Sequence, residues 1–390
     1  MTKRKKRGAG EGTIYHREGE NRWCGELFVG WKEVVDKKTG EVKQGKDIYR
    51  CYGASRTEVQ DQLREVASQR SQGTYVKPSK ETLYDWLQEW LNVYKKRKLR
   101  PTTFESYKTM LEKHIKSTVG GILLKNLTTT HLQKLYNDKE DSGLSTRTVR
   151  YIHQVIHGGL EKARKLKKVA VNVSQDVELP MLTSKERKAL TPDEEKKFFD
   201  ILKTRPWKRW EPAFTVLAES GLRRGELLAL RWDNVDFENK LLYVEQGLTK
   251  TTTAGMKFDK PKTEKANRVI PLTPKAEAAL KTQKVRQAEN KLKAGAGYND
   301  QGLVFAARNG EPFQPRNFNR VIERVCEEAK IKVTAHQFRH TFTTRLIENG
   351  ADVKTTSDIL GHAKSSLTLD VYSHSSLERK REAIAKLSEK

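Results

Sequence analysis

The chain has 390 residues, of which 36% are hydrophobic and 32% are charged, and its formal net charge is +26. No apolar run approaches the roughly 20 residues of a membrane-spanning helix, and no apolar segment follows the basic N-terminus as in a secretory signal. Three scattered cysteines give neither a disulfide framework nor a CxxC metal pair, which favours a reducing cytoplasm. The charge favours a polyanionic partner: nucleic acid first and an acidic membrane surface second, with a merely soluble basic protein as the remaining interpretation.

Residues 1–73 are predicted to form a small three-stranded sheet followed by a helix. Aromatic and β-branched residues are mixed in the stretches RWCGELFVGW and KDIYRCYG, and the DKKTGE between them is typical of a turn. Ser55 and Glu58 fit a capping box that opens the helix RTEVQDQLREVASQR. Such a module suits a minor contact with DNA, and a protein-interaction domain is the alternative.

Residues 80–173 are predicted to form a helical domain, after a linker at 71–80. Its first helix carries a wide apolar stripe, which is more typical of a core than of a ligand platform: Leu83, Trp86, Leu87, Trp90, Leu91 and Tyr94. A later helix opens at Ser145 and places apolar residues inward, namely Val149, Ile152, Val155 and Ile156. Its outward basic residues are Arg147, Arg150, Arg164 and Lys165. One such face is usually only solvated, but several on a small domain favour a surface that follows DNA phosphates.

Residues 188–390 are predicted to form a third domain, after an extended polar segment at 171–190. Thr191 is a helix cap, Pro192 occupies the first helical position, and Glu194 completes a capping box. The rest reads as mostly helix, with strand signals at LLYVEQ and RVIPL and a charged amphipathic helix over the last residues, 375–390. The whole chain is therefore expected to be mainly α with small β elements (α+β).

The stretch ESGLRRGELLALRW places Arg223 and Arg224 at the start of a helix, where backbone N–H groups favour an anion. A guanidinium there can grip phosphate oxygens with two parallel hydrogen bonds. Glu226, three residues after Arg223, is placed to orient that arginine. Taken alone, the stretch is equally consistent with a capped helix that carries surface arginines.

The stretch KFDKPKTEKANRVIPL combines a turn with a strand and puts Lys262 at the tip or edge of a hairpin. A lysine in that position can reach a ligand bound elsewhere and donate a proton to it. On this stretch alone, a solvated loop lysine is the simpler interpretation.

The stretch TAHQFRHTFTTRL places His336 and His340 on one helix face, the spacing of a zinc protease helix. Such a helix needs Glu after its first histidine, and Gln337 stands there, so a metal site is disfavoured. His336 and Arg339 also share a face, and they pair a proton-handling imidazole with a fixed cation. His340 is then a packing residue.

The stretch DILGHAKSSLTLDVYSH reads as a helix capped by Gly361, followed by His362 and, ten residues later, Tyr372. A tyrosine in a small helical piece is usually a packing residue, but tyrosine can also hold a phosphoryl group covalently. Only about one in a thousand is ionised at neutral pH, which costs roughly 4 kcal/mol. Neighbouring arginines, a lysine and histidines would offset that cost.

In chain order these stretches read Gly-Leu-Arg-x-Gly-Glu-Leu, Lys-Thr before a strand, His-x-x-Arg-His, Leu-Gly-His and a tyrosine. The ordered set resembles the tyrosine recombinase (phage integrase) family, most strongly from Thr191 to His374. The helical segment resembles the family's core-site DNA-binding domain, and the N-terminal module resembles the arm-site DNA-binding domain of heterobivalent integrases. Together they are most similar to integrases of conjugative transposons from Gram-positive bacteria.

This resemblance implies how the chemistry is divided. Tyr372 would attack the scissile phosphate, giving a 3′-phosphotyrosine and a free 5′-hydroxyl. Arg223 and Arg339 would clamp the non-bridging oxygens, and Lys262 would protonate the leaving 5′-oxygen. The family needs neither metal nor ATP, so no cofactor is expected.

The resemblance implies supporting roles for three further residues. His336 would assist proton transfer from the tyrosine, His362 would hydrogen-bond the phosphate, and Glu226 would brace the pocket. All motif positions carry the expected residue type.

The resemblance also implies partners: double-stranded DNA at core and arm sites, and a homotetramer that exchanges strands through a Holliday junction. An excisionase or a DNA-bending factor would assist integration or excision of a mobile element. The expected location is the bacterial cytoplasm, at the nucleoid and not at a membrane. The amphipathic segment 375–390 is a candidate for docking on a neighbouring protomer.

Two rival interpretations remain. A type IB topoisomerase uses similar residues but acts as a monomer and relaxes any supercoiled plasmid. A DNA-binding regulator would keep the fold without cleaving DNA.

Overall fold

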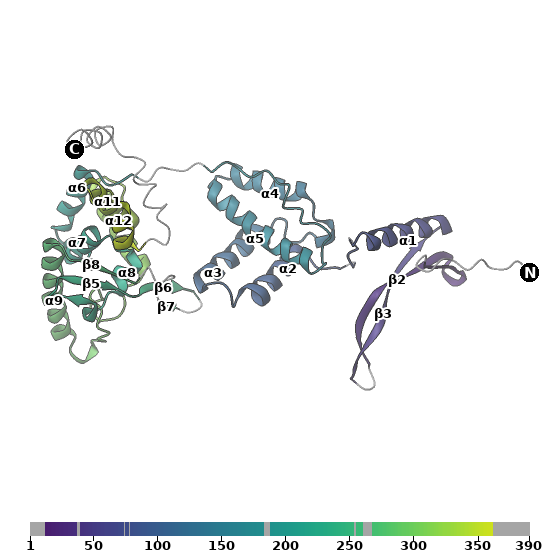
Figure 1. Ribbon diagram of the computed structural model, residues 1–390, viewed down its shortest axis with the longest axis horizontal. Helices are drawn as coiled ribbons and strands as arrows, with labels where there is room; N and C mark the ends of the chain where they lie inside the picture. The colour runs from purple at the N-terminus through teal and green to yellow at the C-terminus, as the bar shows by residue number, and fades with distance from the viewer. Residues whose placement is uncertain are drawn as a thin grey trace, which may run out of the picture. The chain divides into compact units, whose positions relative to one another are not determined.

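The computed structural model describes residues 12–36, 40–73, 75–77, 79–182, 188–252, 255–259 and 267–361 (Figure 1). The chain divides into two compact units, Met1–Thr183 and Ser184–Lys390. Among the described residues, two clusters of buried apolar side chains lie in the first unit and one lies in the second. The helices and small antiparallel sheets confirm the predicted fold class. The boundaries expected within the chain, 1–73, 80–173 and 188–390, stay predictions.

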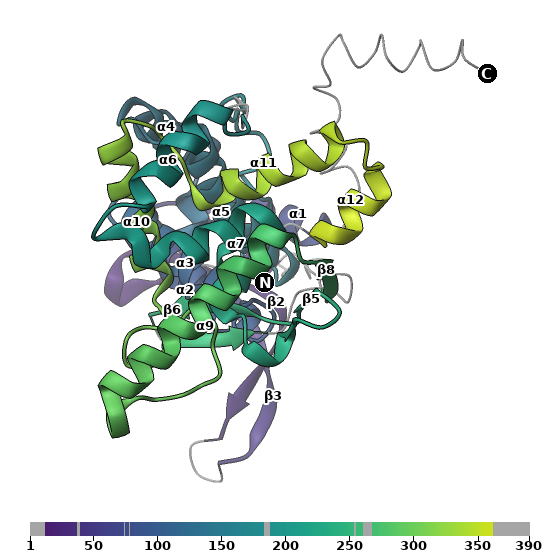
Figure 2. The ribbon, with the colours of Figure 1, turned by 90° about the vertical axis from the view of Figure 1, so that its left-hand side faces the viewer.

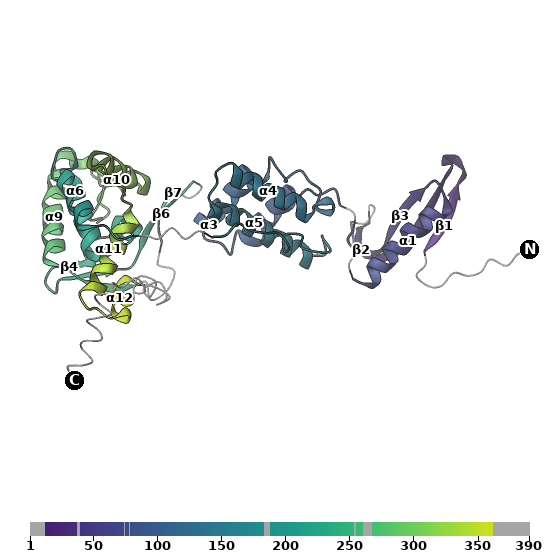
Figure 3. The ribbon, with the colours of Figure 1, turned by 90° about the horizontal axis from the view of Figure 1, so that it is seen from above.

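The first unit begins with a three-stranded antiparallel sheet in the order β1 (Thr13–Arg17), β2 (Arg22–Val35) and β3 (Val42–Gly53). Helix α1 (Arg56–Ser71) packs along one face of this sheet (Figure 3). The Ser55 hydroxyl caps α1 by accepting from the Glu58 N–H at 3.1 Å. The second contact of the predicted capping box differs, because the Glu58 carboxylate accepts from the Ala54 N–H at 2.9 Å.

The same unit continues with helices around a second apolar core. They are α2 (Leu83–Glu89), a π-helical turn at Trp90–Lys95, α3 (Pro101–Met110), a second π-helical turn at Leu111–Ile115, α4 (Thr129–Asp141) and α5 (Thr146–Lys165). The two tryptophans of the predicted stripe are buried, and the Trp86 indole donates to the carbonyl of Gly159 at 2.9 Å. Their assignment to the core is therefore confirmed. Of the four basic residues expected outward on α5, Arg150 is half-buried and donates to the Pro180 carbonyl at 2.8 Å.

The segment expected as a second linker packs against the helices up to Pro180. Asn172 and Ser174 are buried and hydrogen-bonded to each other at 2.7 Å. The Gln133 side chain on α4 accepts from the N–H of Glu178 at 2.9 Å. Asn172 also accepts from the buried N–H of Ser174 at 3.2 Å, so polar side chains satisfy backbone groups of this packed segment. Composition alone does not distinguish it from a solvated linker.

We expect this helical region to lose stability as the pH falls from about 6.5 toward about 4. His153 on α5 contacts the Tyr136 hydroxyl at 3.3 Å. Burial, aided by the charges of His157 and Arg150, lowers the pKa of His153 to about 4. Between these pH values the unfolded chain binds a proton that the folded chain excludes, so acidification favours unfolding.

Hydrogen exchange of α4 and α5 in the full-length protein, corrected for intrinsic rates, measures this effect at about pH 5 and about pH 7. The variant His153→Gln keeps a neutral side chain that can hydrogen-bond, and it is expected to show a smaller difference between the two conditions. An equal pH dependence in both proteins would contradict the assignment to His153.

The second unit opens with α6 (Pro192–Leu202), α7 (Glu211–Ser220) and the short α8 (Arg224–Ala229). Strands β4 (Val235–Asp236), β5 (Leu241–Val244) and β8 (Arg268–Pro271) form one antiparallel sheet, and β6 (Gly247–Thr251) pairs with β7 (Gly255–Asp259). The further α-helices in the described part of this unit are α9 (Pro274–Ala294), α10 (Pro315–Ala329), α11 (Ala335–Glu348) and α12 (Val353–Leu360). Helix α7 packs against both α9 and α11 (Figure 2). This arrangement brings the end of α7, the start of α8 and the middle of α11 together.

Several local predictions for this unit are confirmed. Thr191 and Glu194 form the expected reciprocal capping box, with Pro192 at the first helical position. Strands lie where LLYVEQ and RVIPL predicted them.

The predicted helix at 375–390 lies outside the described residues. None of the described helices combines the length and the apolar character that a membrane span requires.

Candidate active site

The turn between α7 and α8 directs the two arginines of the Gly-Leu-Arg-Arg stretch. Gly221 has a positive φ of 62°, and a Cβ at this position would lie 2.4 Å from the Phe342 ring, so only glycine fits. Leu222 is buried, which anchors the turn. Arg223 then precedes α8 with extended backbone and Arg224 begins the helix.

Glu226 holds Arg223 by two contacts. Its carboxylate accepts from the Arg223 guanidinium at 2.6 Å and from the Arg223 backbone N–H at 2.8 Å. This is the orienting contact that the three-residue spacing suggested. Glu226 is buried, so the pair is shielded from solvent on the side of the carboxylate.

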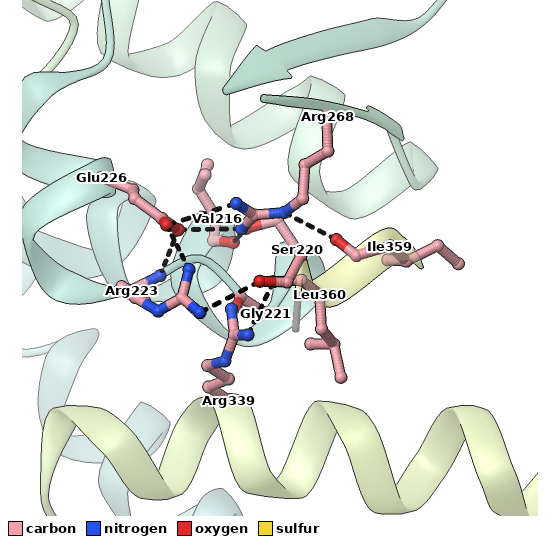
Figure 4. A network of polar contacts seen from close by, with 10 residues as sticks. Val216, Ser220, Gly221, Arg223, Glu226, Arg268, Arg339, Ile359 and Leu360 are labelled. Atoms are coloured by element: carbon pink, nitrogen blue, oxygen red, sulfur yellow. Dashed lines mark hydrogen bonds and ion pairs between the residues drawn. The ribbon is translucent and has the colours of Figure 1, made fainter. Parts of the chain in front are cut away.

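Arg268, at the start of β8, is a member of the site that the sequence analysis missed. Its buried guanidinium contacts both oxygens of the Glu226 carboxylate, at 2.8 and 3.2 Å, and its Nε donates to the carbonyl of Ile359 at 2.7 Å (Figure 4). A signal was present in RVIPL: Arg268 lies on the same strand face as the buried Ile270. A charged residue on a buried strand face needs a partner, but the sequence does not say which.

Arg339 reaches the same cluster from α11. It is 3% exposed, and its guanidinium donates to the carbonyls of Gly221 at 2.8 Å and Leu360 at 2.6 Å (Figure 4). Burial, together with the charge of Arg223, lowers the pKa of Arg339 to about 9. An anion bound beside this side chain would favour its charged form.

Three arginines converge on the C-terminal end of α12. Arg268, Arg339 and Arg223 donate in turn to the carbonyls of residues 359, 360 and 361, the last at 3.3 Å. These carbonyls lie at a helix end, where intrahelical partners are missing and positive charge is favourable. Gly361 adopts a left-handed conformation with φ 64°, which confirms its predicted role as the cap of this helix.

The electrostatic balance of this cluster favours an anion. Glu226 is the acidic residue of this cluster, and its carboxylate contacts the guanidinium groups of Arg223 and Arg268. Burial alone would raise the pKa of Glu226, but the hydrogen bonds and charge of Arg268, with the charge of Arg223, outweigh it and hold that pKa below its usual range. Glu226 therefore stays ionised, and three cations to one carboxylate leave an excess of positive charge.

A cavity of about 440 Å³ adjoins this cluster. Arg223, Arg224, His336 and Arg339 are among its lining residues, and His340 is not. His336 is exposed at the start of α11, one turn before Arg339. His336 and Arg339 thus line the same cavity, which Arg223 also lines.

Gln337, at the position where a zinc protease needs Glu, has a structural role. Its side chain accepts from the Thr334 N–H at 2.9 Å and completes the capping box of α11. In the described part of the chain, no group of three or more His, Cys, Asp and Glu side chains is arranged to hold a metal ion. Lys262, His362 and Tyr372 lie outside the described residues, between β7 and β8 and after α12.

Comparison with known sequences gives the chain its family. The profile of the phage integrase family matches residues 188–379, and that of the phage integrase N-terminal SAM-like domain matches residues 82–139. The chain belongs to the phage integrase (tyrosine recombinase) family. It is therefore an enzyme of the site-specific recombinase class.

Two relatives of this recombinase cover most of its length. A tyrosine recombinase XerC-like protein of Caldanaerobacter subterraneus subsp. tengcongensis is 28% identical over 389 residues, covering 90% of this chain and 99% of the relative. The ICEBs1 integrase of Bacillus subtilis is 26% identical over 292 residues, covering 74% of this chain and 78% of the relative. The family and the similarity to integrases of mobile elements agree with the resemblance found in the sequence.

Solved integrase structures share the fold. The Tn1549 transposon integrase in complex with a circular intermediate DNA has a TM-score of 0.68 at 21% identity and covers 79% of this chain and 99% of its own. A lambda integrase dimer bound to a COC′ core site has a TM-score of 0.57 at 18% identity, covering 94% and 96%. At these identities the likeness concerns the fold.

Proposed function

We propose that this recombinase cuts and rejoins DNA at the cavity beside the arginine cluster, through a covalent bond between Tyr372 and a 3′-phosphate. The observation that carries the proposal is the convergence of Arg223, which precedes α8, and Arg339 on α11 on a cavity that His336 also lines. Both arginines are held by fixed partners, so their geometry is set before a phosphate arrives. Preorganised cations of this kind stabilise the charge that develops during phosphoryl transfer.

The proposed first step is an in-line displacement. The Tyr372 oxygen bonds to the scissile phosphorus while the bond to the 5′-oxygen breaks. Lys262 protonates the leaving 5′-oxygen, and His336 assists removal of the tyrosine proton. Arg223 and Arg339 bind the non-bridging oxygens, Glu226 positions Arg223, and His362 donates a hydrogen bond to the phosphate.

The reverse of this step joins DNA strands, because the phosphotyrosine bond retains the energy of the phosphodiester. Neither a metal nor ATP enters the scheme. We propose that four protomers on two core sites exchange strands through a Holliday junction, with residues 1–73 on arm sites. Integration and excision of a mobile element would then involve an excisionase or a DNA-bending factor at the nucleoid.

We expect the wild-type protein to form a covalent adduct with a nicked suicide substrate that carries its core site, and we expect the adduct to vanish in Tyr372→Phe. The substitution removes only the nucleophilic oxygen, so binding to the same DNA should be unchanged. The measurement is a denaturing gel of the cut strand labelled at its 5′-end, because that fragment stays bound to the protein. The absence of an adduct on any end of the element would contradict the proposal.

A plasmid assay separates this activity from that of a topoisomerase. Relaxation of a supercoiled plasmid without core sites would favour the topoisomerase, whereas recombination that needs two sites supports the proposed function. Binding without an adduct, in the wild type, would favour a DNA-binding regulator.

A further inference from the structure

The second arginine of the Gly-Leu-Arg-Arg stretch lines the same cavity as the first but is held from another direction. Arg223 bonds to Glu226 and to the carbonyl of Gly361. Arg224 instead donates from Nη1 to the side-chain oxygen of Asn319, on α10, at 2.8 Å. Although the two residues are adjacent in sequence, their guanidinium groups are held by different elements.

Not all hydrogen-bond donors of the Arg224 guanidinium group have a partner among the described residues. Its side chain is half-buried, and its Nε is buried without a hydrogen-bond partner among the described residues. Burial lowers the pKa of Arg224. A buried, unpaired donor on a cation is costly unless an anion or another acceptor meets it.

Asn319 holds Arg224 through its side-chain oxygen, so the N–H donors of the same amide group are not used in this contact. It uses its carbonyl oxygen on the arginine, and a side-chain amide still carries two N–H donors. Glu323, one turn further along α10, is the acidic residue among those that line the cavity. Four basic side chains therefore share this cavity with one carboxylate that is exposed.

We propose that Arg224, oriented by Asn319, binds a second DNA phosphate, adjacent to the one that Arg223 and Arg339 bind. The phosphates of a DNA strand follow one another along the backbone. Two guanidinium groups that are held by different elements of one cavity are therefore better placed to bind two successive phosphates than to bind a single phosphate together. Occupation of both positions fixes the register of the strand and thus selects which phosphate meets the nucleophile. This inference rests on the proposed function.

The test replaces single phosphates around the cut by uncharged methylphosphonates in the nicked suicide substrate. In the wild type, one replacement next to the scissile position should slow adduct formation by about 10- to 100-fold, the range for a lost charge-assisted hydrogen bond. Arg224→Gln should be slower by a similar factor on unmodified DNA. The same replacement should then cause little further loss, because the contact is already gone.

Two variants sharpen the test. Asn319→Ala leaves Arg224 charged but less well oriented, so it should show a smaller loss with the same dependence on that one phosphate. Arg324→Gln removes the same charge from an exposed position on α10 that does not line the cavity, and it should behave like the wild type. If Arg224→Gln does not fold, Asn319→Ala across the phosphate series carries the test.

The outcomes separate this inference from the function on which it rests. No adduct from the wild type on unmodified DNA would overturn the proposed function. A wild-type adduct, together with an Arg224→Gln variant that cleaves normally or stays sensitive to every replacement, would overturn the inference alone. Arg224 would then have a structural role, linking α8 to α10 through its hydrogen bond to Asn319.

Discussion

Arg268→Leu is expected to destabilise the second unit by about 3–5 kcal/mol, the cost of removing one partner from a buried ion pair. The substitution leaves Glu226 buried without the guanidinium that contacts both of its oxygens, and it also removes the hydrogen bond to the carbonyl of Ile359. Hydrogen exchange of α8 and β8 in the full-length protein measures the loss locally. Adduct formation should fall in parallel, because Glu226 and the C-terminal end of α12 both lose a hydrogen-bond partner.

A matched control and a double variant identify the cause. Lys281→Leu removes a surface ion pair with Glu277 on α9 and should leave the exchange rates of α8 and β8 close to those of the wild type. Combining Arg268→Leu with Glu226→Leu also removes the buried carboxylate, which in the single variant keeps only its contacts with Arg223, so part of the stability should return while adduct formation stays low. Wild-type exchange rates in the Arg268→Leu variant would refute the proposed support.

Arg339→Lys is expected to slow adduct formation by roughly 10²–10³-fold, the effect of losing one preorganised donor of charge stabilisation. Lysine keeps the positive charge but lacks the planar fork, and so it cannot donate to the carbonyls of Gly221 and Leu360 and also to a phosphate in the same geometry. Single-turnover cleavage of the suicide substrate measures the rate. DNA binding should change little, because many other cations contribute to it.

The control for this prediction lies on the same helix. Arg345 forms an ion pair with Glu195 and, unlike Arg339, does not line the cavity. Arg345→Lys should therefore cleave at close to the wild-type rate. An Arg339→Lys variant that cleaves equally well would show that charge alone suffices at this position.

Much of the local structure could be predicted because it depends on neighbouring residues. Thr191, Pro192 and Glu194 specify a helix start within one turn, and the structure has that start. The spacing of Trp86 and Trp90 places both on one helix face, and both are buried. The contact between Glu226 and Arg223 spans three residues, so spacing alone brought it within reach.

Contacts between distant segments could not be predicted in this way. Arg268 meets Glu226 across 42 positions of sequence, and Arg224 meets Asn319 across 95. Nothing in the local pattern selects these partners, because several basic and polar residues precede and follow each of them. The packing of residues 172–180 against α4 could not be predicted for the same reason.

By itself, the sequence determined the helical character of the chain, the starts and caps of individual helices and the ordered motifs that identify the recombinase family. Each of these depends on residue type and on spacing within a few turns, which a linear pattern records. Only the tertiary structure decided which cations share a carboxylate, which carbonyls hold them and which side chains face one cavity. These relations arise when α8, β8, α11 and α12 pack together, and packing is a property of surfaces that the chain brings together from far apart.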